Sequence, residues 1–251
     1  MKIIIIGKRS NLSKSLKDKI KNIYIFGSSD IFSSHFENKI KLIKPDIVIY
    51  NSFFPLNQFT EEKNLNKIIE GTTLVTNILL KKLSKSKSIK KIILSSSSAL
   101  KNLFINSFEN NNKRSLYSSL KLLNEQLFIK YCTDNKIDLV IARLFNLYGN
   151  YDNSSIIYKL LNSKKNNINI NIFNNGNFKR DFIHTNDVVK SYIRFIENKC
   201  SGIYEVGTGQ SITINELMQL SGIKKSLIKF KKTKNLEVAK SEADVFKLNK
   251  L

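Results

Sequence analysis

Short apolar runs, rich in isoleucine and valine, recur through the first two thirds of the chain, and polar or turn-forming residues bound each of them. Apolar and polar residues do not alternate within these runs. Continuous apolar runs of this length indicate strands that are buried on both faces of a sheet. Five strands are predicted, at Ile3–Ile6, Ile23–Phe26, Pro45–Tyr50, Ile89–Leu94 and Leu139–Ala142.

Longer segments whose apolar residues follow a helical spacing lie between these runs. We expect helices at Asn11–Lys21, Thr72–Leu83 and Leu116–Tyr131. Strands that alternate with helices are typical of parallel sheets. The pattern therefore predicts an α/β fold, with a Rossmann-type doubly wound parallel sheet and a small C-terminal substrate-binding lobe.

The pattern changes after residue 149. Residues Asn166–Asn177 are mostly polar, with an isoleucine alternation that indicates one short strand, and helices are expected at Asp187–Asn198 and Ile214–Leu220. The tail from about Lys224 is basic and weakly patterned. We expect a dinucleotide-binding domain at 1–150, with segments at about 178–200 returning to it, and a small substrate-binding lobe with a basic tail at 151–251.

The chain carries a formal net charge of +22 over 251 residues. Such a charge can indicate a polyanionic partner, for example nucleic acid or a membrane surface. Here the lysines are spread along the whole chain and accompany no nucleic-acid-binding motif, so the sequence favours a general enrichment in lysine and no nucleic acid partner. No run of 18 apolar residues is present, so no membrane span is expected.

The two cysteines, Cys132 and Cys200, do not form a CxxC pair. The sequence therefore indicates neither a disulfide framework nor a metal site. We expect a protein of the reducing cytoplasm.

The turn after the first predicted strand has the position and order of a dinucleotide-binding loop. Glycines in such loops permit a tight turn and the close approach of the pyrophosphate, which backbone N–H groups at the helix start hold. One glycine, Gly7, is kept, and the small residues Ser10 and Ser13 stand where the other two would be. The candidate cofactor-binding residues of this turn are Gly7, Arg9, Ser10, Asn11 and Leu12.

Arg9 bears on which dinucleotide binds. A cation in this turn can pair with the 2′-phosphate of NADP(H), whereas NAD binders usually place a carboxylate at the end of the second strand. That strand is followed here by Gly27-Ser28-Ser29, and Asp30 comes too late along the chain for this role. The sequence therefore favours NADP(H) over NAD(H).

Tyr117 and Lys121 stand four residues apart in a predicted helix, so they share one helix face. A nearby lysine cation favours the phenolate and lowers the pKa of a tyrosine, which can then exchange a proton near neutral pH. Taken alone, this pair is also compatible with an ordinary helix surface.

Four serines, Ser95 to Ser98, follow a buried strand. Ligands bind at the carboxyl ends of strands in open parallel sheets. A serine hydroxyl there can hydrogen-bond the reacting oxygen while Tyr117 transfers the proton. We therefore expect this strand end and the Tyr117–Lys121 helix to form one site.

Five segments with recognisable motifs follow one another along the chain, at Lys90–Ala99, Leu116–Glu125, Ala142–Gly149, Gly176–Val189 and Tyr204–Gly209. The third reads ARLFNLYG, and the fourth contains RDFIHTNDVV. Together they resemble the extended short-chain dehydrogenases/reductases of the NAD-dependent epimerase/dehydratase group. The resemblance covers about residues 1–220.

The resemblance implies roles for individual residues. Tyr117 would be the catalytic acid/base, and Lys121 would hold the nicotinamide ribose, with Ser95 also on the cofactor side. Ser97 would be the catalytic serine, with Ser98 as the adjacent alternative. Ser98, Asn146 and Arg180 would face a nucleotide-sugar substrate. The resemblance also implies a homodimer that pairs through two helices, the catalytic helix among them.

Departures from the family pattern narrow the expected reaction. Sugar 4,6-dehydratases resemble one another in an Asp-Glu pair where this chain has Ser98 and Ala99, so a dehydratase is disfavoured. The setting of Arg9 resembles the GDP-fucose synthase and 4-ketoreductase branch. The first hypothesis is an NADPH-dependent reductase of a nucleotide-linked 4-keto(-6-deoxy) sugar in surface-polysaccharide biosynthesis. An NAD-dependent nucleotide-sugar 4-epimerase is the second, and a non-catalytic dinucleotide-binding sensor is the third.

Overall fold

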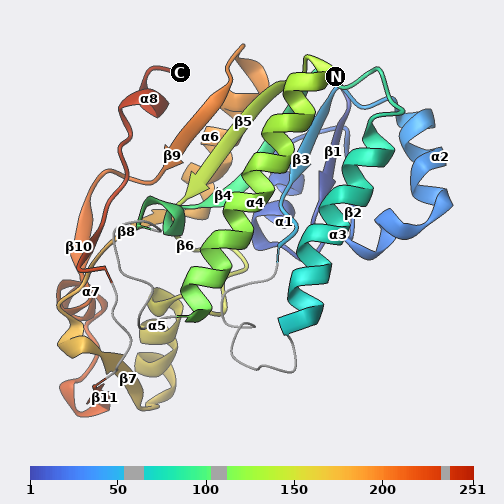
Figure 1. The fold of residues 1–251 in the computed structure, drawn as a ribbon. Helices are drawn as coiled ribbons and strands as arrows, with labels where there is room; N and C mark the ends of the chain where they lie inside the picture. The colour runs from blue at the N-terminus through green and yellow to red at the C-terminus, as the bar shows by residue number, and fades with distance from the viewer. Residues whose placement is uncertain (54–64, 103–111, 233–237) are drawn as a thin grey trace.

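Six parallel strands form the central sheet in a computed structural model that describes residues 1–53, 65–102, 112–232 and 238–251 (Figure 1). Their order across the sheet is β2-β1-β3-β4-β5-β9. The strands are β1 (Ile3–Ile6), β2 (Ile23–Phe26), β3 (Ile47–Tyr50), β4 (Lys91–Ser97), β5 (Asp138–Leu144) and β9 (Gly202–Val206). All five strands predicted from apolar runs lie in this sheet, and the predicted Rossmann-like α/β fold is confirmed.

Strand β9 has no apolar run that would have predicted it. Its sequence is GIYEV, in which a glycine and a glutamate interrupt the apolar residues. It lies at one end of the strand order beside β5, and Ile203 is 40% exposed there. A strand at the edge of a sheet needs less apolar surface than a central one.

Helices cover both faces of the central sheet. Successive residues of a strand point to opposite faces, so the apolar side chains of each strand divide between the two faces. Ile3 and Ile5 of β1 pack in a hydrophobic cluster with α1 (Asn11–Lys19) and α6 (Thr185–Glu197). Ile4 and Ile6 pack in a second cluster with α2 (Ser34–Ile43), α3 (Leu65–Leu83) and α4 (Asn112–Asn135).

Three helices differ from the prediction. Helix α4 runs from Asn112 to Asn135, four residues longer at each end than the predicted Leu116–Tyr131. Helix α3 begins at Leu65, a full turn and more before Thr72, and the Thr72 hydroxyl donates to the carbonyl oxygen of Ile68 within this helix. Helix α2 was not predicted, although Phe36, Ile40 and Ile43 recur at helical spacing and are buried.

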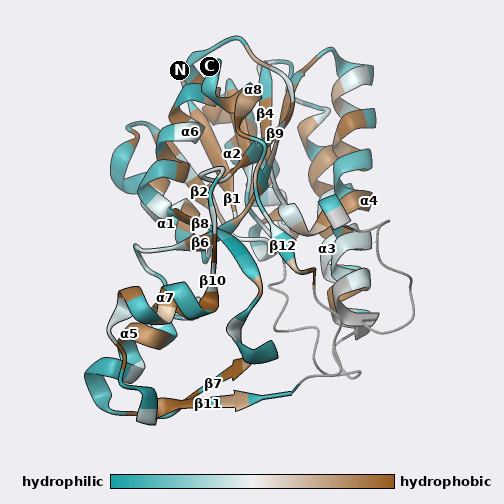
Figure 2. Cartoon of the chain, turned by 90° about the vertical axis from the view of Figure 1, so that its left-hand side faces the viewer, coloured by the Kyte–Doolittle hydropathy of each residue, from teal (hydrophilic) through white to brown (hydrophobic). Residues whose placement is uncertain are grey.

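A smaller region lies beyond the carboxyl ends of the central strands (Figures 1 and 2). Its sheet has the order β10-β8-β12, and β6 also pairs with β8. The elements are β6 (Asn146–Tyr148), α5 (Ile156–Asn166), β7 (Ile170–Phe173), β8 (Lys179–His184), β10 (Ser211–Thr213), α7 (Ile214–Ser221), β11 (Ile228–Lys231) and β12 (Lys240–Ser241). A separate hydrophobic cluster, which includes Leu160, Ile172 and Leu217, stabilises this region. The last helix, α8 (Phe246–Asn249), lies at the other end, beside the central sheet.

The predicted domain boundary at residue 150 stays a prediction. Within the segment expected to return to the first domain, α6 packs on the central sheet, whereas β8 pairs with the short strands outside it. The C-terminal helix α8 contacts β9, and its Leu248 joins the hydrophobic cluster of α1 and α6.

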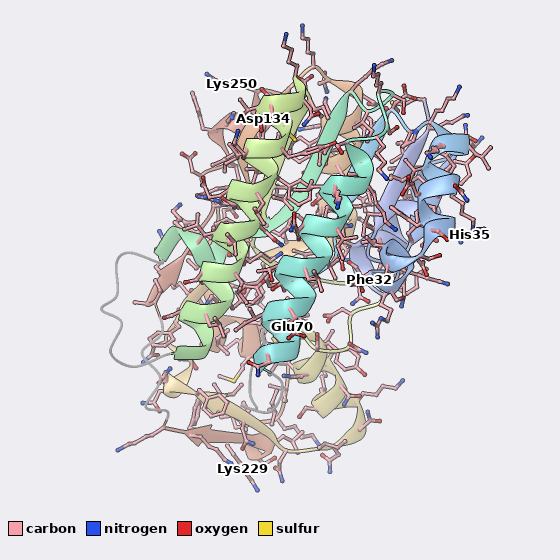
Figure 3. All side chains as sticks on the ribbon, turned by 45° about the vertical axis from the view of Figure 1, so that its right-hand side comes forward. Phe32, His35, Glu70, Asp134, Lys229 and Lys250 are labelled. Carbon is pink, nitrogen blue, oxygen red and sulfur yellow. The ribbon has the colours of Figure 1, made fainter. Side chains whose placement is uncertain are left out.

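Lysines lie at opposite ends of the molecule, with Lys229 on the smaller region and Lys250 near the far end of the central sheet (Figure 3). No helix among the described residues is long and apolar enough to cross a bilayer. Cys132 and Cys200 are both buried and free.

Candidate active site

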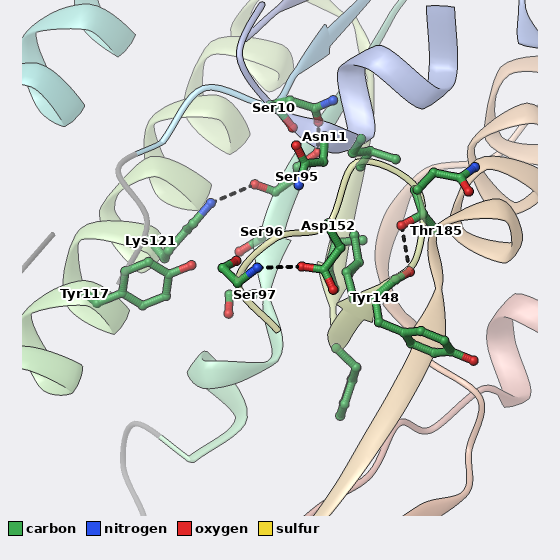
Figure 4. Close-up of a pocket in the computed structure, with 17 residues that line it drawn as sticks. Ser10, Asn11, Ser95, Ser96, Ser97, Tyr117, Lys121, Tyr148, Asp152 and Thr185 are labelled. Atoms are coloured by element: carbon green, nitrogen blue, oxygen red, sulfur yellow. Dashed lines mark hydrogen bonds between the residues drawn. The ribbon is translucent and has the colours of Figure 1, made fainter. Parts of the chain in front are cut away.

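A cavity of about 320 Å³ opens at the carboxyl ends of the central strands (Figure 4). It brings together residues predicted for the cofactor and for catalysis, namely Ser10, Asn11, Leu12, Ser95, Ser97, Tyr117 and Lys121. The wall on the other side comes from β5, β6 and the turn that follows, with Leu144, Tyr148 and Asp152. The elements that supply these residues are far apart in the sequence and meet because parallel strands end at one edge of the sheet.

The cofactor turn keeps its glycine where the backbone requires one. Gly7 has φ +126°, and a Cβ atom there would lie 2.8 Å from the carbonyl carbon of Asn51. Ser10 is the N-cap residue of α1, and its side chain makes no capping hydrogen bond. The N-terminal amides of α1 therefore face the cavity without a side-chain cap, which suits an anionic pyrophosphate.

Ser13, which stands in place of a glycine, is fully buried and has a polar partner. The Asn51 amide nitrogen donates to the Ser13 hydroxyl at 3.1 Å. Asn51 was not predicted as a site residue. The sequence feature that could have indicated it is its position, because Asn51 is the polar residue that directly follows the buried strand β3.

Ser95 links the cofactor side of the cavity to the catalytic helix. Its hydroxyl donates to the Asn51 side-chain oxygen and shares a 2.5 Å hydrogen bond with the Tyr192 hydroxyl of α6. Its carbonyl oxygen accepts from Lys121 Nζ at 3.0 Å. Ser95 therefore takes part in the site through its backbone as well as its side chain.

The Tyr117 hydroxyl meets Ser97 in the cavity (Figure 4). Burial raises the pKa of Tyr117, and the hydrogen bond with Ser97 opposes that rise. The direction is opposite to the lowered pKa expected from the sequence. The physical reason is that the free-energy cost of removing the phenolate from water exceeds its stabilisation by neighbouring groups. The ammonium of Lys121 donates to the Ser95 carbonyl oxygen.

Lys121 is 7% exposed, and burial lowers its pKa to about 7. The negative charge of Glu125 opposes this shift. The Lys121 ammonium also lies 4.0 Å from the centre of the Phe53 ring, which packs edge-on against Tyr117. A lysine with a pKa near 7 is partly protonated at neutral pH.

The structure separates the two candidate serines. Ser97 is the last residue of β4, bonds with Tyr117 and accepts the Ala99 N–H at 3.2 Å. Ser98 begins the following 3-10 helix, Ser98–Asn102, and does not line the cavity. Ser97 is therefore the serine that lies beside Tyr117.

Four other predicted residues do not line the cavity, namely Gly7, Arg9, Asn146 and Arg180. Arg9 is exposed in the turn before α1. The Asn146 amide nitrogen donates to the carbonyl oxygen of Asp181, and Arg180 donates to the carbonyl oxygen of Val238 while it stacks on Phe178. Their roles in binding stay predictions.

Asp30 lies closer to the end of β2 than its sequence position suggested. The short helix Ser29–Phe32 folds back, and the Asp30 carboxylate accepts the Gly27 N–H at 2.7 Å. Asp30 does not line the cavity, so its role toward the cofactor ribose stays a prediction. A carboxylate is present at the strand end where NAD binders usually place one.

Comparison with known proteins identifies related sequences and folds. Residues 2–207 match the NAD dependent epimerase/dehydratase family. An ADP-L-glycero-D-manno-heptose-6-epimerase of Brachyspira hyodysenteriae is 34% identical over 125 residues, which is 45% of this chain and 39% of that protein. The match to this curated relative thus spans about two fifths of its length.

Solved structures share the fold at lower identity. A UDP-glucose 4-epimerase of Thermotoga maritima, solved with UDP-glucose, is 19% identical with a TM-score of 0.83, over 100% of this chain and 92% of that chain. A UDP-glucuronic acid 4-epimerase of Bacillus cereus, solved with UDP-glucuronic acid and NAD, is 19% identical with a TM-score of 0.80 and the same coverage. At these identities the similarity concerns the fold.

Proposed function

The chain belongs to the NAD dependent epimerase/dehydratase family, and on that premise we propose that it is a dinucleotide-dependent enzyme that acts on a nucleotide-linked sugar. The observation that carries the proposal is the meeting of Ser97, Tyr117 and Lys121 in one cavity with the uncapped start of α1. Ser10, Asn11 and Leu12 at the start of α1 line this cavity, where their backbone amides suit a bound pyrophosphate. When bound, the dinucleotide supplies the hydride chemistry.

Each residue of the site has a defined task in this proposal. The Ser97 hydroxyl hydrogen-bonds the reacting sugar oxygen, and Tyr117 gives that oxygen a proton or removes one. Lys121, as a cation, favours the phenolate form of Tyr117 and holds the ribose of the dinucleotide. Ser10, Asn11 and Leu12 hold the pyrophosphate with backbone amides.

The first candidate reaction is the NADPH-dependent reduction of a nucleotide-linked 4-keto(-6-deoxy) sugar. Arg9 supports it, because an exposed guanidinium in this turn suits a 2′-phosphate. In this reaction Tyr117 protonates the new alkoxide, and each turnover consumes one reduced dinucleotide. The GDP-fucose synthase-like branch belongs to this candidate.

The second candidate is an NAD-dependent nucleotide-sugar 4-epimerase. Asp30 favours it, because its carboxylate lies at the end of β2 and can accept from ribose hydroxyls. The similar folds of two 4-epimerases are in keeping with it. An epimerase regenerates its dinucleotide within each turnover, so net consumption separates the two candidates.

The test has two arms on the purified protein: NADPH or NADH with a panel of nucleotide-linked 4-keto sugars, and NAD⁺ or NADP⁺ with pairs of nucleotide-linked sugars that differ only in the configuration at C4. Tyr117→Phe should lower turnover by about 10²–10⁴-fold and leave dinucleotide affinity nearly unchanged, because the hydroxyl is the proton donor. Tyr24→Phe, at an exposed tyrosine of β2, is the matched control and should keep full activity.

The readings of this assay distinguish the alternatives. Oxidation of NADPH with each product formed supports the reductase, and interconversion without net oxidation supports the epimerase. Clear preference for NADH would contradict the role given to Arg9. Dinucleotide binding with no turnover on any sugar would favour the non-catalytic sensor, and equal activity of the Tyr117→Phe variant would remove this tyrosine from the mechanism.

We also propose that the protein forms a homodimer through α3 and α4. Leu74 of α3 and Leu123 of α4 are 46% and 41% exposed, although both are large apolar side chains. The two helices pack side by side on one face of the sheet. A second copy would cover these leucines.

A further inference from the structure

An ion pair between a partly exposed arginine and a buried glutamate lies one helical turn beyond Lys121 and outside the cavity. Arg143 of β5 donates to Glu125 of α4 with two nitrogens, Nε to Oε1 at 3.0 Å and Nη2 to Oε2 at 2.7 Å. Ser96 of β4 donates to the same Oε1 at 2.5 Å. The Glu125 side chain is 1% exposed, so its carboxylate is held entirely by protein groups from two neighbouring strands.

Lys121 occupies a place where a positive charge is costly. Its ammonium donates to the Ser95 carbonyl and lies over the Phe53 ring, and neither group carries a formal charge. Removing an ammonium from water without an anionic partner favours its neutral form. Yet the proposed reaction needs the cation, because its charge favours the phenolate of Tyr117.

Glu125 is placed to supply the missing negative charge. It follows Lys121 by four residues in α4, so the two side chains share a helix face. Burial lowers the pKa of Lys121 to about 7, and the Glu125 charge raises it against that effect. The other groups that bear on this balance are Tyr117 on the same helix, Arg143 on β5, and Glu205 of β9, which acts on Arg143.

We propose that the charge of Glu125, partly offset by its ion-pair partner Arg143, favours the protonated form of Lys121, so that this pair sets the pH range in which Lys121 can assist Tyr117. The proposal rests on the function proposed above, in which Lys121 acts as a cation. Neither member of the pair lines the cavity, so both are positioning residues that act through Lys121.

The two members act on Lys121 in opposite directions. A carboxylate without Arg143 would exert its full negative charge and raise the pKa of Lys121. An arginine without Glu125 would add a second positive charge nearby and lower that pKa further. Opposite shifts from the two halves of one pair are a signature of electrostatics, since loss of packing alone would not reverse its sign between them.

The test measures the titration of Lys121 directly, by trace acetylation with acetic anhydride from pH 5 to 11 and mass spectrometry of the Lys121 peptide. The exposed Lys17 of α1 serves as an internal reference for the reagent. Glu125→Gln should move the midpoint for Lys121 down by about one pH unit or more, and Arg143→Met should move it up. Arg143→Lys keeps the charge and should leave the midpoint near that of the wild type.

Each outcome decides the proposal. Shifts of opposite sign in the Lys121 midpoint of the two variants support the proposal. Shifts of the same sign, or the absence of a shift in one or both variants, overturn it. If Glu125→Gln does not fold, as judged by circular dichroism, the upward shift in Arg143→Met decides alone, and its absence overturns the proposal. The measurement uses neither substrate nor dinucleotide, so a failure of the proposed function would leave its result unaffected.

Discussion

Gly7 holds a backbone conformation that an alanine adopts only with strain. Its φ is +126°, and an added Cβ atom would meet the Asn51 backbone at 2.8 Å. We expect Gly7→Ala to lower the free energy of unfolding by about 1–3 kcal/mol and to weaken dinucleotide binding, because the turn must open to relieve the contact. Urea denaturation and a fluorescence titration with NADPH measure the two effects.

Gly27→Ala is the control for this prediction. The nearest atom to a Cβ at Gly27 is the Ser29 hydroxyl oxygen at 3.5 Å, which is an ordinary contact. The free energy of unfolding of the Gly27→Ala variant should therefore stay within about 0.5 kcal/mol of that of the wild type. Equal losses in the two glycine variants would refute the argument from the Gly7 geometry.

For individual residues, sequence motifs identified the candidate catalytic side chains. They did not identify residues whose contacts join distant parts of the sequence. The sequence predicted that Tyr117 and Lys121 share a helix face and that serines end a strand. Both predictions were possible because the residues concerned are close in the sequence. The Asn51–Ser13 hydrogen bond joins residues 38 positions apart. The backward reach of Asp30 depends on a short helix that no periodic pattern announces.

Among the secondary-structure elements, β8 is joined to two later segments of the chain by the side chain of Asp181. This residue lies on β8, is fully buried, and accepts the N–H groups of Thr208, Gly209 and Ala243 together with the Thr208 hydroxyl. The turn after β9 and the segment that follows β12 are therefore both anchored on β8. Loss of the carboxylate would leave buried N–H donors without their acceptor.

We expect Asp181→Ala to lower the free energy of unfolding by about 3–5 kcal/mol, because several buried hydrogen bonds to one charged acceptor are lost. Asp187→Ala, at an exposed residue of α6 with an ion pair to Lys190, should cost less than about 1 kcal/mol. Both values come from urea denaturation. A similar small loss for the two variants would show that Asp181 is not a structural anchor.

A strand that is buried on both faces gives the clearest sequence pattern, although the edge strand β2, with Tyr24 42% exposed, was predicted as well. Strand β1 is buried on both faces, and its four isoleucines are almost fully inaccessible, so its pattern is unbroken. Strand β9 and the short strands β6, β10 and β12 have partly exposed residues and mixed composition. Their pairing is decided by distant partners, which a local pattern does not contain.

For the whole molecule, the exposed leucines of α3 and α4 carry the expectation of a homodimer. Leu74→Glu should shift the protein to monomer in analytical ultracentrifugation, because a carboxylate would have to be buried between the two copies. Leu42→Glu on α2 is the matched control, since Leu42 is 79% exposed and lies on another helix. A wild-type protein that is monomeric at all concentrations would rule out the proposed interface.

Strand β8 is the common base on which the outer part of the molecule is built. Strands β6, β10 and β12 all pair with it, and Tyr148 and His184 stand opposite each other in register. The stretch between these two residues, with α5 and β7, therefore departs from and comes back to the same place. Because both ends of this stretch are fixed on the same strand pair, its length and sequence can change without moving β4 or α4. Under the proposed function, substitutions in this stretch are the ones that would change sugar specificity while Ser97, Tyr117 and Lys121 keep their places.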